Sequence, residues 1–177
     1  MPRARSQVAV REAGEEDVPV LVGFGEALRD SGALPRRAAR LPLAELYTQA
    51  LDDPERRVVL AVGDAGEPLG MAIFVRAPAT SLLEVPALHV THVVVDDRHR
   101  RRGAGRALLA AAATQAEELG LEQVVVSVPP GDRDANRFYA RLGFAPLVMR
   151  RVAPAAPLKR RLTGEHEQVS RRRALRR

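Results

Sequence analysis

A strand, a basic turn and a helix follow one another between Leu88 and Gly120, and this stretch constrains the fold more than any other. Residues 88–95 are rich in β-branched side chains and lie between Pro86 and a pair of aspartates, which is typical of a strand. From Gly103 onward apolar residues recur at helical spacing, and Gly120 follows the last of them as a helix-ending glycine. We therefore expect an α/β domain in which this strand leads directly into a helix.

The turn between this strand and the helix has the composition of an anion-binding site. The first amide N–H groups of a helix have no partner within it, and the helix dipole places partial positive charge there. Gly103 and Gly105 lack a Cβ atom, so an anion can approach the backbone closely. Arg100, Arg101 and Arg102 add charge that suits phosphate oxygens. These features indicate a diphosphate site, although a solvated connection between strand and helix explains the turn alone equally well.

Two common phosphate-binding loops do not fit this turn. It has no lysine followed by serine or threonine, which excludes a P-loop, and Leu108 stands where a dinucleotide fingerprint has its third glycine. After their apolar strand, Arg100, Gly103 and Gly105 instead resemble the acyl-CoA loop of the GNAT acetyltransferase superfamily. Residues 136–144 are similar to a second signature of that family, which consists of Asn, Tyr and Leu-Gly-Phe.

The resemblance covers roughly residues 8–152 and implies an α/β (α+β) GNAT-like fold with a mixed, mostly antiparallel central sheet and helices on both faces. The strand that holds Val93–Val95 and the strand after the central helix are expected to be parallel neighbours that splay apart. The apolar pattern predicts strands over residues 7–11, 57–62, 69–76, 88–95 and 123–128 and from 144 to about 152. It predicts a first helix that starts at the acids of residues 15–17 and is ended by Ser31 and Gly32, and further helices over residues 43–51, 103–119 and 134–142.

The resemblance implies an acyltransferase that moves the acetyl group of acetyl-CoA directly to an amine of a small molecule, peptide or protein. The pantetheine arm would enter the gap between the splayed strands, and the backbone amides of the basic turn would hold the pyrophosphate. The residues implied to bind acetyl-CoA are Val93, Val94, Val95, Arg100, Arg101, Arg102, Gly103, Ala104, Gly105, Arg106, Asn136 and Tyr139. No metal is expected, because no compact set of ligands is present.

Tyr139 matches the family tyrosine that is often proposed to protonate the departing sulfur. A phenol with a pKa of about 10 is reasonably matched to a thiol with a pKa of about 8.5. The adjacent Phe138 offers a simpler interpretation, since one ring of the pair must face the core. We favour Tyr139 as the functional ring because of its place in the motif.

The sequence leaves the general base open among two histidines of the strand, a glutamate before it and an ordered water. Many relatives carry a glutamate on the central strand, whereas residues 88–92 contain no carboxylate. His92 lies nearer the expected thioester, His89 occupies a typical glutamate position, and Glu84 precedes the strand. Strand alternation puts His89 and Thr91 on one face and His92 on the other, unless a bulge intervenes.

Composition limits the class of protein. The chain has 177 residues, which suits one domain with a substantial core, and no cysteine, which excludes disulfides and a covalent cysteine intermediate. No stretch approaches the run of about twenty apolar residues that a membrane span needs, and the first residues lack an apolar signal core. We therefore expect a cytoplasmic protein.

The positive charge of the chain lies in its tail. Residues 158–177 hold eight basic and two acidic residues, which equals the whole net charge of +6. We expect an acetyltransferase domain over residues 1–153 and a flexible linker and arginine-rich tail over residues 154–177. Nucleic-acid binding is not expected of the domain, only of the tail if at all. Dimers are common in such folds, and the sequence does not decide whether this chain forms a homodimer.

Two other functions remain open on the sequence. The missing glutamate on the central strand mildly favours a catalytically weak, acyl-CoA-binding regulatory module, whereas Tyr139 and Asn136 argue against it. The tail suggests an acetyltransferase acting on charged RNA, against which the balanced charge of residues 1–157 counts.

Overall fold

The computed structural model describes residues 8–30, 42–79, 85–129, 131–148, 151 and 153–163. The chain divides into two compact units, Met1–Asp132 and Arg133–Arg177, and each is considered by itself. The boundary that we expect between a folded domain and a tail at residues 153 and 154 stays a prediction. Among the described residues, no helix combines the length and the apolar character needed to cross a membrane.

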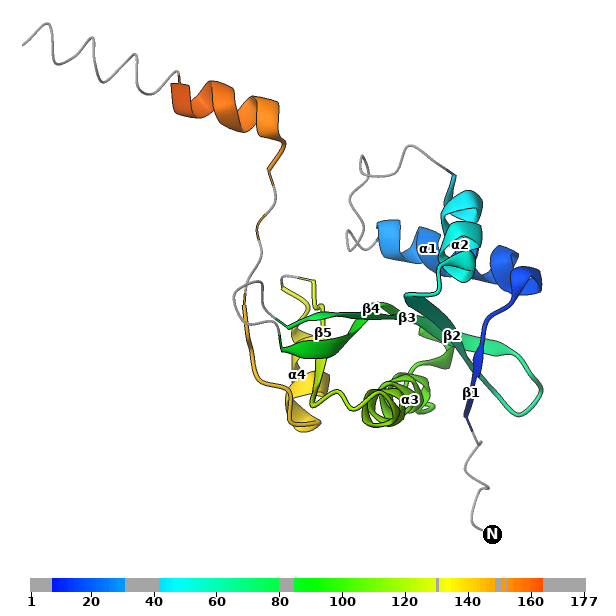
Figure 1. Cartoon of the computed structure of the whole chain (residues 1–177). Helices are drawn as coiled ribbons and strands as arrows, with labels where there is room; N and C mark the ends of the chain where they lie inside the picture. The colour runs from blue at the N-terminus through cyan, green and yellow to red at the C-terminus, as the bar shows by residue number, and fades with distance from the viewer. Residues whose placement is uncertain are drawn as a thin grey trace, which may run out of the picture. The chain divides into compact units, whose positions relative to one another are not determined.

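The first unit is built on one five-stranded sheet whose spatial order follows the chain, β1-β2-β3-β4-β5 (Figure 1). The strands are β1 (Ala9–Glu12), β2 (Arg56–Val62), β3 (Pro68–Pro78), β4 (Pro86–Val95) and β5 (Gln123–Val126). The first three pairs are antiparallel and the β4–β5 pair is parallel. The expected mixed sheet with one parallel pair is confirmed, as are the two strands joined through the glycine-containing loop at residues 63–67.

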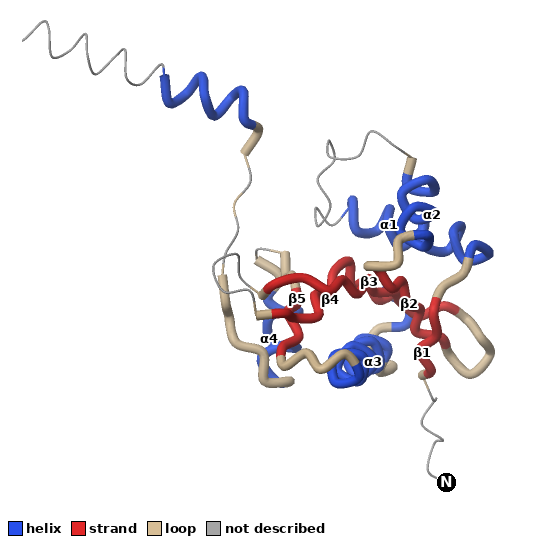
Figure 2. Tube along the Cα trace, in the orientation of Figure 1, coloured by secondary structure: helices blue, strands red, loops and turns tan. Residues whose placement is uncertain are grey.

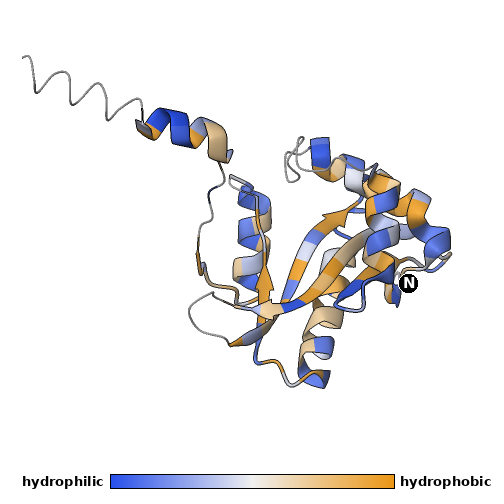
Figure 3. Ribbon diagram, turned by 45° about the horizontal axis from the view of Figure 1, so that its top comes forward, coloured by the Kyte–Doolittle hydropathy of each residue, from blue (hydrophilic) through white to orange (hydrophobic). Residues whose placement is uncertain are grey.

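Helices cover both faces of this sheet. Helices α1 (Val18–Asp30) and α2 (Leu43–Asp52) pack together on one face, and α3 (Ala104–Glu118) packs against the other (Figure 2). The alternation of the strands explains this arrangement. Along β2, Val58 and Leu60 join the core beneath α1 and α2, while the equally buried Val59 faces the opposite side. Figure 3 shows hydrophobic residues along the strands and on the helices that cover them.

An ion pair fixes the connection from β1 into α1. Arg11 donates to both carboxylate oxygens of Asp17, at 2.6 and 2.7 Å, and the backbone N–H of Gly14 donates to the same carboxylate at 2.9 Å. The pKa of Asp17 is held below its usual value, chiefly by the hydrogen bond from Arg11. Because Asp17 is buried just before α1 begins, these bonds set the direction in which α1 crosses the sheet.

A bulge interrupts the pairing of β3 with β4. Met71 pairs with Val94 and Ile73 with Thr91, so Ala72 alone lies opposite two residues of β4, His92 and Val93. His92 has a φ of 52°, a left-handed conformation that is uncommon for a residue other than glycine. The bulge shifts the register of β4, so the simple alternation expected for Thr91 and His92 does not apply.

The second unit contains α4 (Arg133–Arg141), as expected, and a further helix over residues 155–163. The strand expected from Phe144 to about Val152 is not formed over residues 144–148, which is a correction of the sequence prediction. Pro146 has no N–H for a strand ladder, and Leu147 and Val148 are exposed. The apolar composition of that segment suggested a strand, but no neighbouring strand pairs with residues 144–148.

Candidate active site

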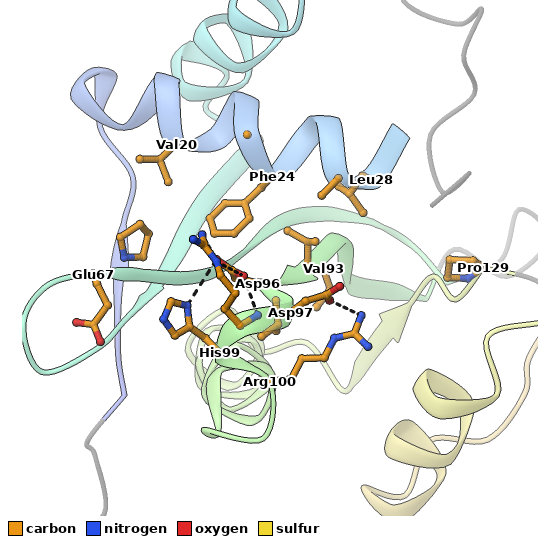
Figure 4. Close-up of a pocket in the computed structure, with 16 residues that line it drawn as sticks. Val20, Phe24, Leu28, Glu67, Val93, Asp96, Asp97, His99, Arg100 and Pro129 are labelled. Carbon is orange, nitrogen blue, oxygen red and sulfur yellow. Dashed lines mark hydrogen bonds and ion pairs between the residues drawn. The ribbon is translucent and has the colours of Figure 1, made fainter. Parts of the chain in front are cut away.

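A cavity of about 820 Å³ lies in the first unit, between α1 and the C-terminal end of β4 (Figure 4). Its volume falls within the range of small-molecule sites. Figure 4 shows α1 side chains above it and the residues that follow β4 below it. It is lined by Val20, Gly23, Phe24, Ala27, Leu28, Glu67, Pro68, Val93, Val94, Val95, Asp96, Asp97, Arg98, His99, Arg100 and Pro129. One end of the cavity is therefore apolar, and the other is charged.

The parallel pairing of β4 with β5 stops where the cavity begins. The last paired residues are Val90 and Val126, although β4 continues to Val95. Val93–Val95 and Pro129, which follows β5, both line the cavity, so it extends into the space where the two strands no longer pair. The expected splayed, parallel pair is thus observed. A strand-like ligand could pair with the free edge of β4 in the way that extended peptides add to sheet edges.

The turn after β4 holds two of its arginines in ion pairs with the preceding acids. Asp96 accepts hydrogen bonds from the side chain and the backbone N–H of Arg98, and these bonds lower the pKa of Asp96 to about 2. Arg100 lies 2.7 Å from Asp97, and both side chains of this pair are exposed. Arg98 and Arg100 both line the cavity, so their charges are available to an anion that displaces the acids.

His99 lies in the same turn, and the sequence analysis did not predict it as a site residue. Its ring nitrogen Nδ1 is buried without a hydrogen-bond partner among the described residues, and lies 3.6 Å from a carboxylate oxygen of Asp96.

Helix α3 begins beside this turn without a side-chain cap. Gly103 is its N-cap with a φ of 97°, and Arg101 also has a positive φ, of 65°. The first bond within the helix runs from the N–H of Ala107 to the carbonyl of Gly103, so the amides of residues 104–106 precede the helical ladder. A Cβ at Gly103 would have only Val8 nearby, at 4.0 Å, but the backbone conformation would be strained. Gly103 thus adopts a left-handed conformation that glycine takes without strain.

Four of the residues implied to bind acetyl-CoA line the cavity, namely Val93, Val94, Val95 and Arg100. The others of the turn lie beside it along the chain and do not line it: Arg101, Arg102, Gly103, Ala104, Gly105 and Arg106. Ala104 is buried beneath the start of α3. These residues contribute backbone amides at the helix start, and the cavity supplies the adjoining space.

The two histidines of β4 differ in their partners. His89 Nε2 lies 3.0 Å from the carbonyl oxygen of Pro78, and His92 Nδ1 lies 3.1 Å from the hydroxyl oxygen of Thr91. The His92 ring is open to solvent on one side, yet its pKa is lowered from the usual value, first because the surrounding protein desolvates the imidazolium and second because Arg56 repels it. Glu84, the third candidate base, lies outside the described residues.

Asn136 and Tyr139 lie on α4 of the second unit. Tyr139 is buried, and its ring makes edge-to-face contacts with Phe138 and Phe144, with centroids 5.3 and 5.5 Å apart. Tyr139 is more buried than Phe138. Core packing is therefore one reason for a large aromatic ring at this position. Its role as an acid stays a prediction. Among the described residues no group of histidines and carboxylates could hold a metal ion.

Helices α1 and α2 contribute differently to the site. Gly23 and Phe24 of α1 line the cavity, whereas Tyr47 of α2 is packed in the core, where burial raises its pKa to about 12. The sequence analysis did not identify the two acids of the turn or Pro129, although acids two and three residues before arginines are a recognisable signal for local ion pairs.

Comparison with known proteins agrees with this architecture. The acetyltransferase (GNAT) family model matches residues 12–144, while no curated protein matches the chain in sequence. A ribosomal-protein-alanine N-acetyltransferase from Brucella melitensis is similar in structure, with a TM-score of 0.65 and 21% identity over 84% of this chain and 99% of that one.

Two further structures share the fold. An aminoglycoside acetyltransferase from an uncultured soil metagenomic sample has a TM-score of 0.65 and 19% identity, over 83% of this chain and 95% of that one. A transcriptional regulator from Bacillus halodurans has a TM-score of 0.69 and 21% identity, over 84% of this chain and 99% of that one. At these identities the structures establish the fold alone. The family match, which covers most of the chain, shows that the protein belongs to the GNAT acetyltransferase family.

Proposed function

We propose that this chain is an N-acetyltransferase that transfers the acetyl group of acetyl-CoA directly to a primary amine. Members of its family generally use acetyl-CoA. The observation that carries the proposal is the cavity of about 820 Å³, which joins the unpaired end of β4 to a turn bearing two arginines. A pantetheine arm is long and strand-like and ends in a diphosphate, so it matches both ends of this space.

The transfer requires a base and, at the end, a proton donor. The amine lone pair attacks the thioester carbon, a C–N bond forms, the C–S bond breaks, and CoA leaves as a thiolate. The proton lost by the amine needs an acceptor, and we assign this role to His92, because it directly precedes Val93 of the cavity wall, whereas the Nε2 atom of His89 is engaged by the carbonyl oxygen of Pro78. Tyr139 is our candidate for protonating the thiolate, a role argued from its place in the family motif.

The acceptor is best sought among two classes of amine. The name of the Brucella melitensis protein specifies the alanine of a ribosomal protein, and that of the metagenomic protein an aminoglycoside. Both classes present a primary amine, and the apolar α1 wall and Glu67 of the cavity are compatible with an organic cation. We therefore propose peptides with a free N-terminus and polyamine-like small molecules as first acceptors.

A turnover assay tests the proposal directly. The purified chain is mixed with acetyl-CoA and a panel of both amine classes, and released CoA is measured with a thiol reagent. Because the chain contains no cysteine, the reagent reports only CoA. We expect release that depends on the amine and an acetylated product by mass spectrometry. Absence of turnover with every amine, together with absence of acetyl-CoA binding, would contradict the proposal.

Matched glycine variants test the diphosphate end of the site. Gly103 and Gly120 lie at opposite ends of α3, both with positive φ and both with open space around them. Gly103→Glu places a carboxylate where we expect phosphates, whereas Gly120→Glu introduces the same charge and a similar strain far away along the helix. By calorimetry, we expect acetyl-CoA affinity to fall by at least about tenfold in the first variant and to stay unchanged in the second.

A regulatory module that binds acyl-CoA without transferring it is the second candidate. The described part of β4 carries no carboxylate, and a protein named as a transcriptional regulator shares the fold. The two functions separate in the same experiments. Calorimetric binding of acetyl-CoA that disappears in Gly103→Glu, without CoA release with any amine, would favour the module.

A further inference from the structure

The bulge in β4 holds His92 in a left-handed backbone conformation, which is unfavourable for a residue other than glycine. Its φ is 52°, where the backbone of such a residue is strained. Such strain persists only where the surrounding structure fixes it, and it concentrates at functional sites. Here the strain lies one residue before Val93, where the cavity begins.

The bulge turns the His92 ring toward the side chain of Thr91. His92 Nδ1 lies 3.1 Å from Thr91 Oγ1. Thr91 is paired with Ile73, whose side chain belongs to the core beneath α1 and α2, so Thr91 lies on the side of the sheet that these helices cover. Neither residue is among those that line the cavity, but His92 directly precedes Val93, which is among them.

The hydrogen bonds of Thr91 determine which ring nitrogen of His92 carries hydrogen. A hydroxyl has one hydrogen, and that of Thr91 is donated to the carbonyl oxygen of Ile73, at 3.3 Å. With that hydrogen directed to Ile73, the oxygen accepts from His92, and this arrangement assigns the hydrogen of the neutral ring to Nδ1. The lone pair is then on Nε2, which points away from Thr91.

We propose that Thr91 is a positioning residue that fixes His92 as the Nδ1–H tautomer and thereby makes Nε2 the atom that takes the proton from the acceptor amine. This inference rests on the proposed acetyltransferase function. In the step, the N–H bond of the amine breaks, its proton moves to Nε2, and the amine nitrogen forms the bond to the acetyl carbon.

His89 provides an internal comparison on the same strand. Its Nε2 atom faces the carbonyl oxygen of Pro78 at 3.0 Å, and a carbonyl only accepts, so Nε2 of His89 carries the hydrogen. The two histidines are thus held as opposite tautomers. His89 uses its Nε2 to join the ends of β3 and β4, whereas His92 has its Nε2 available for chemistry.

The charges around His92 favour the neutral ring. Arg56 of β2 is the charged group that acts on it, and both Arg56 and the desolvation of the ring lower the pKa of His92. On the helices over this face, Tyr47 has a pKa raised to about 12 and is therefore neutral near pH 7, and Arg29 acts on Tyr47. His92 is thus uncharged near neutral pH and can act as an acceptor of a proton.

The test measures the tautomer first and the activity second. Long-range ¹H–¹⁵N spectra of the full chain with ¹⁵N-labelled histidine distinguish Nδ1–H from Nε2–H rings, and His92→Asn assigns the signals. We expect Nδ1–H for His92 and Nε2–H for His89. In Thr91→Val, which keeps the shape and removes the hydroxyl, His92 should lose its single tautomer while His89 stays unchanged, and Thr91→Ser should restore it.

The kinetic part uses the same variants. We expect Thr91→Val to lower kcat roughly tenfold, with unchanged acetyl-CoA affinity and with Thr91→Ser close to the parent. An Nε2–H ring at His92 in the parent, or a tautomer unaffected by Thr91→Val, would overturn the inference, as would an unchanged kcat. A confirmed tautomer in a chain that acetylates no amine would instead refute the proposed function, so the two failures are distinguishable.

Discussion

The two halves of β4 differ in almost every physical property. From Pro86 to Val90 the strand is paired regularly with β3 on one side and β5 on the other, and Leu88 and Val90 are almost fully buried. From Thr91 to Val95 it has a bulge, no pairing with β5, and partly exposed side chains. The first half holds the sheet together, and the second half forms a wall of the cavity.

The difference shows how one strand can serve both stability and function. Regular pairing and burial stabilise the fold, but they leave no backbone edge free for a ligand and no residue in a strained backbone conformation. The irregular half stabilises the fold less. It has a backbone edge at Val93–Val95 that does not pair with β5, and it contains His92, whose ring lies beside Thr91. Mutations in the two halves should therefore separate stability from activity.

The largest expected effect is on turnover, from His92→Asn in the irregular half. Asparagine tolerates left-handed backbone better than most residues, so the fold should be at least as stable as the parent. Loss of a general base should lower kcat by about 100- to 10,000-fold. Steady-state kinetics and urea unfolding measure the two effects. If His92→Asn lost stability as well as activity, His92 would support the fold, and the two halves of β4 would not have separate roles.

The next effect is on stability, from Leu88→Ala in the regular half. Leu88 is 1% exposed, and truncation of a buried leucine costs about 2–5 kcal/mol. Acetyl-CoA affinity of the folded fraction should not change. Val94→Ala is the matched variant in the other half, where the side chain is only partly buried, and it should destabilise clearly less. Equal losses of unfolding free energy in urea would contradict the division of the strand into two roles.

The strand itself was predictable from the sequence, but the bulge within it was not. A run of β-branched residues and the helical spacing after Gly103 predict the strand and the helix, because burial of apolar side chains dominates both. The bulge at His92 comes from a register shift between β3 and β4, which is a property of the pair and not of either strand alone. The sequence could therefore name His92 as a candidate but could not predict its orientation or its partner.

The same limit applies to the turn and to the end of the chain. The glycines and arginines indicated an anion site, but how Asp96 and Asp97 would pair with those arginines depends on side-chain geometry. The absence of a strand over residues 144–148 has a similar cause, since strand formation needs a partner that hydrophobic pattern alone does not reveal.

A smaller effect is expected from Asp97→Asn, at the end of the irregular half. The exposed Asp97–Arg100 ion pair contributes little to stability, so unfolding free energy should change by less than about 0.5 kcal/mol. Arg100 would no longer be neutralised, and acetyl-CoA should bind roughly two- to fivefold more tightly at low salt, an advantage that high salt removes. Glu12→Gln, which frees Arg57 outside the cavity, is the control and should leave the affinity unchanged.

The smallest expected effect is the pH dependence of stability that His92 itself produces. Its pKa is lowered in the folded chain by desolvation and by Arg56, relative to about 6.5 in an unfolded chain. Between these two values the unfolded chain binds more protons, so the free energy of unfolding must rise with pH, and above about 6.5 this contribution is constant. Urea unfolding from pH 5 to 8 should show a smaller rise in His92→Asn than in the parent. The difference should be modest because the ring is open to solvent, and Arg56→Gln should reduce it further.

If the parent instead loses stability relative to His92→Asn as the pH rises through this window, then the folded chain favours the protonated ring. In that case His92 could not be the neutral base that accepts the proton of the amine, and the irregular half of β4 would have to be assigned another role.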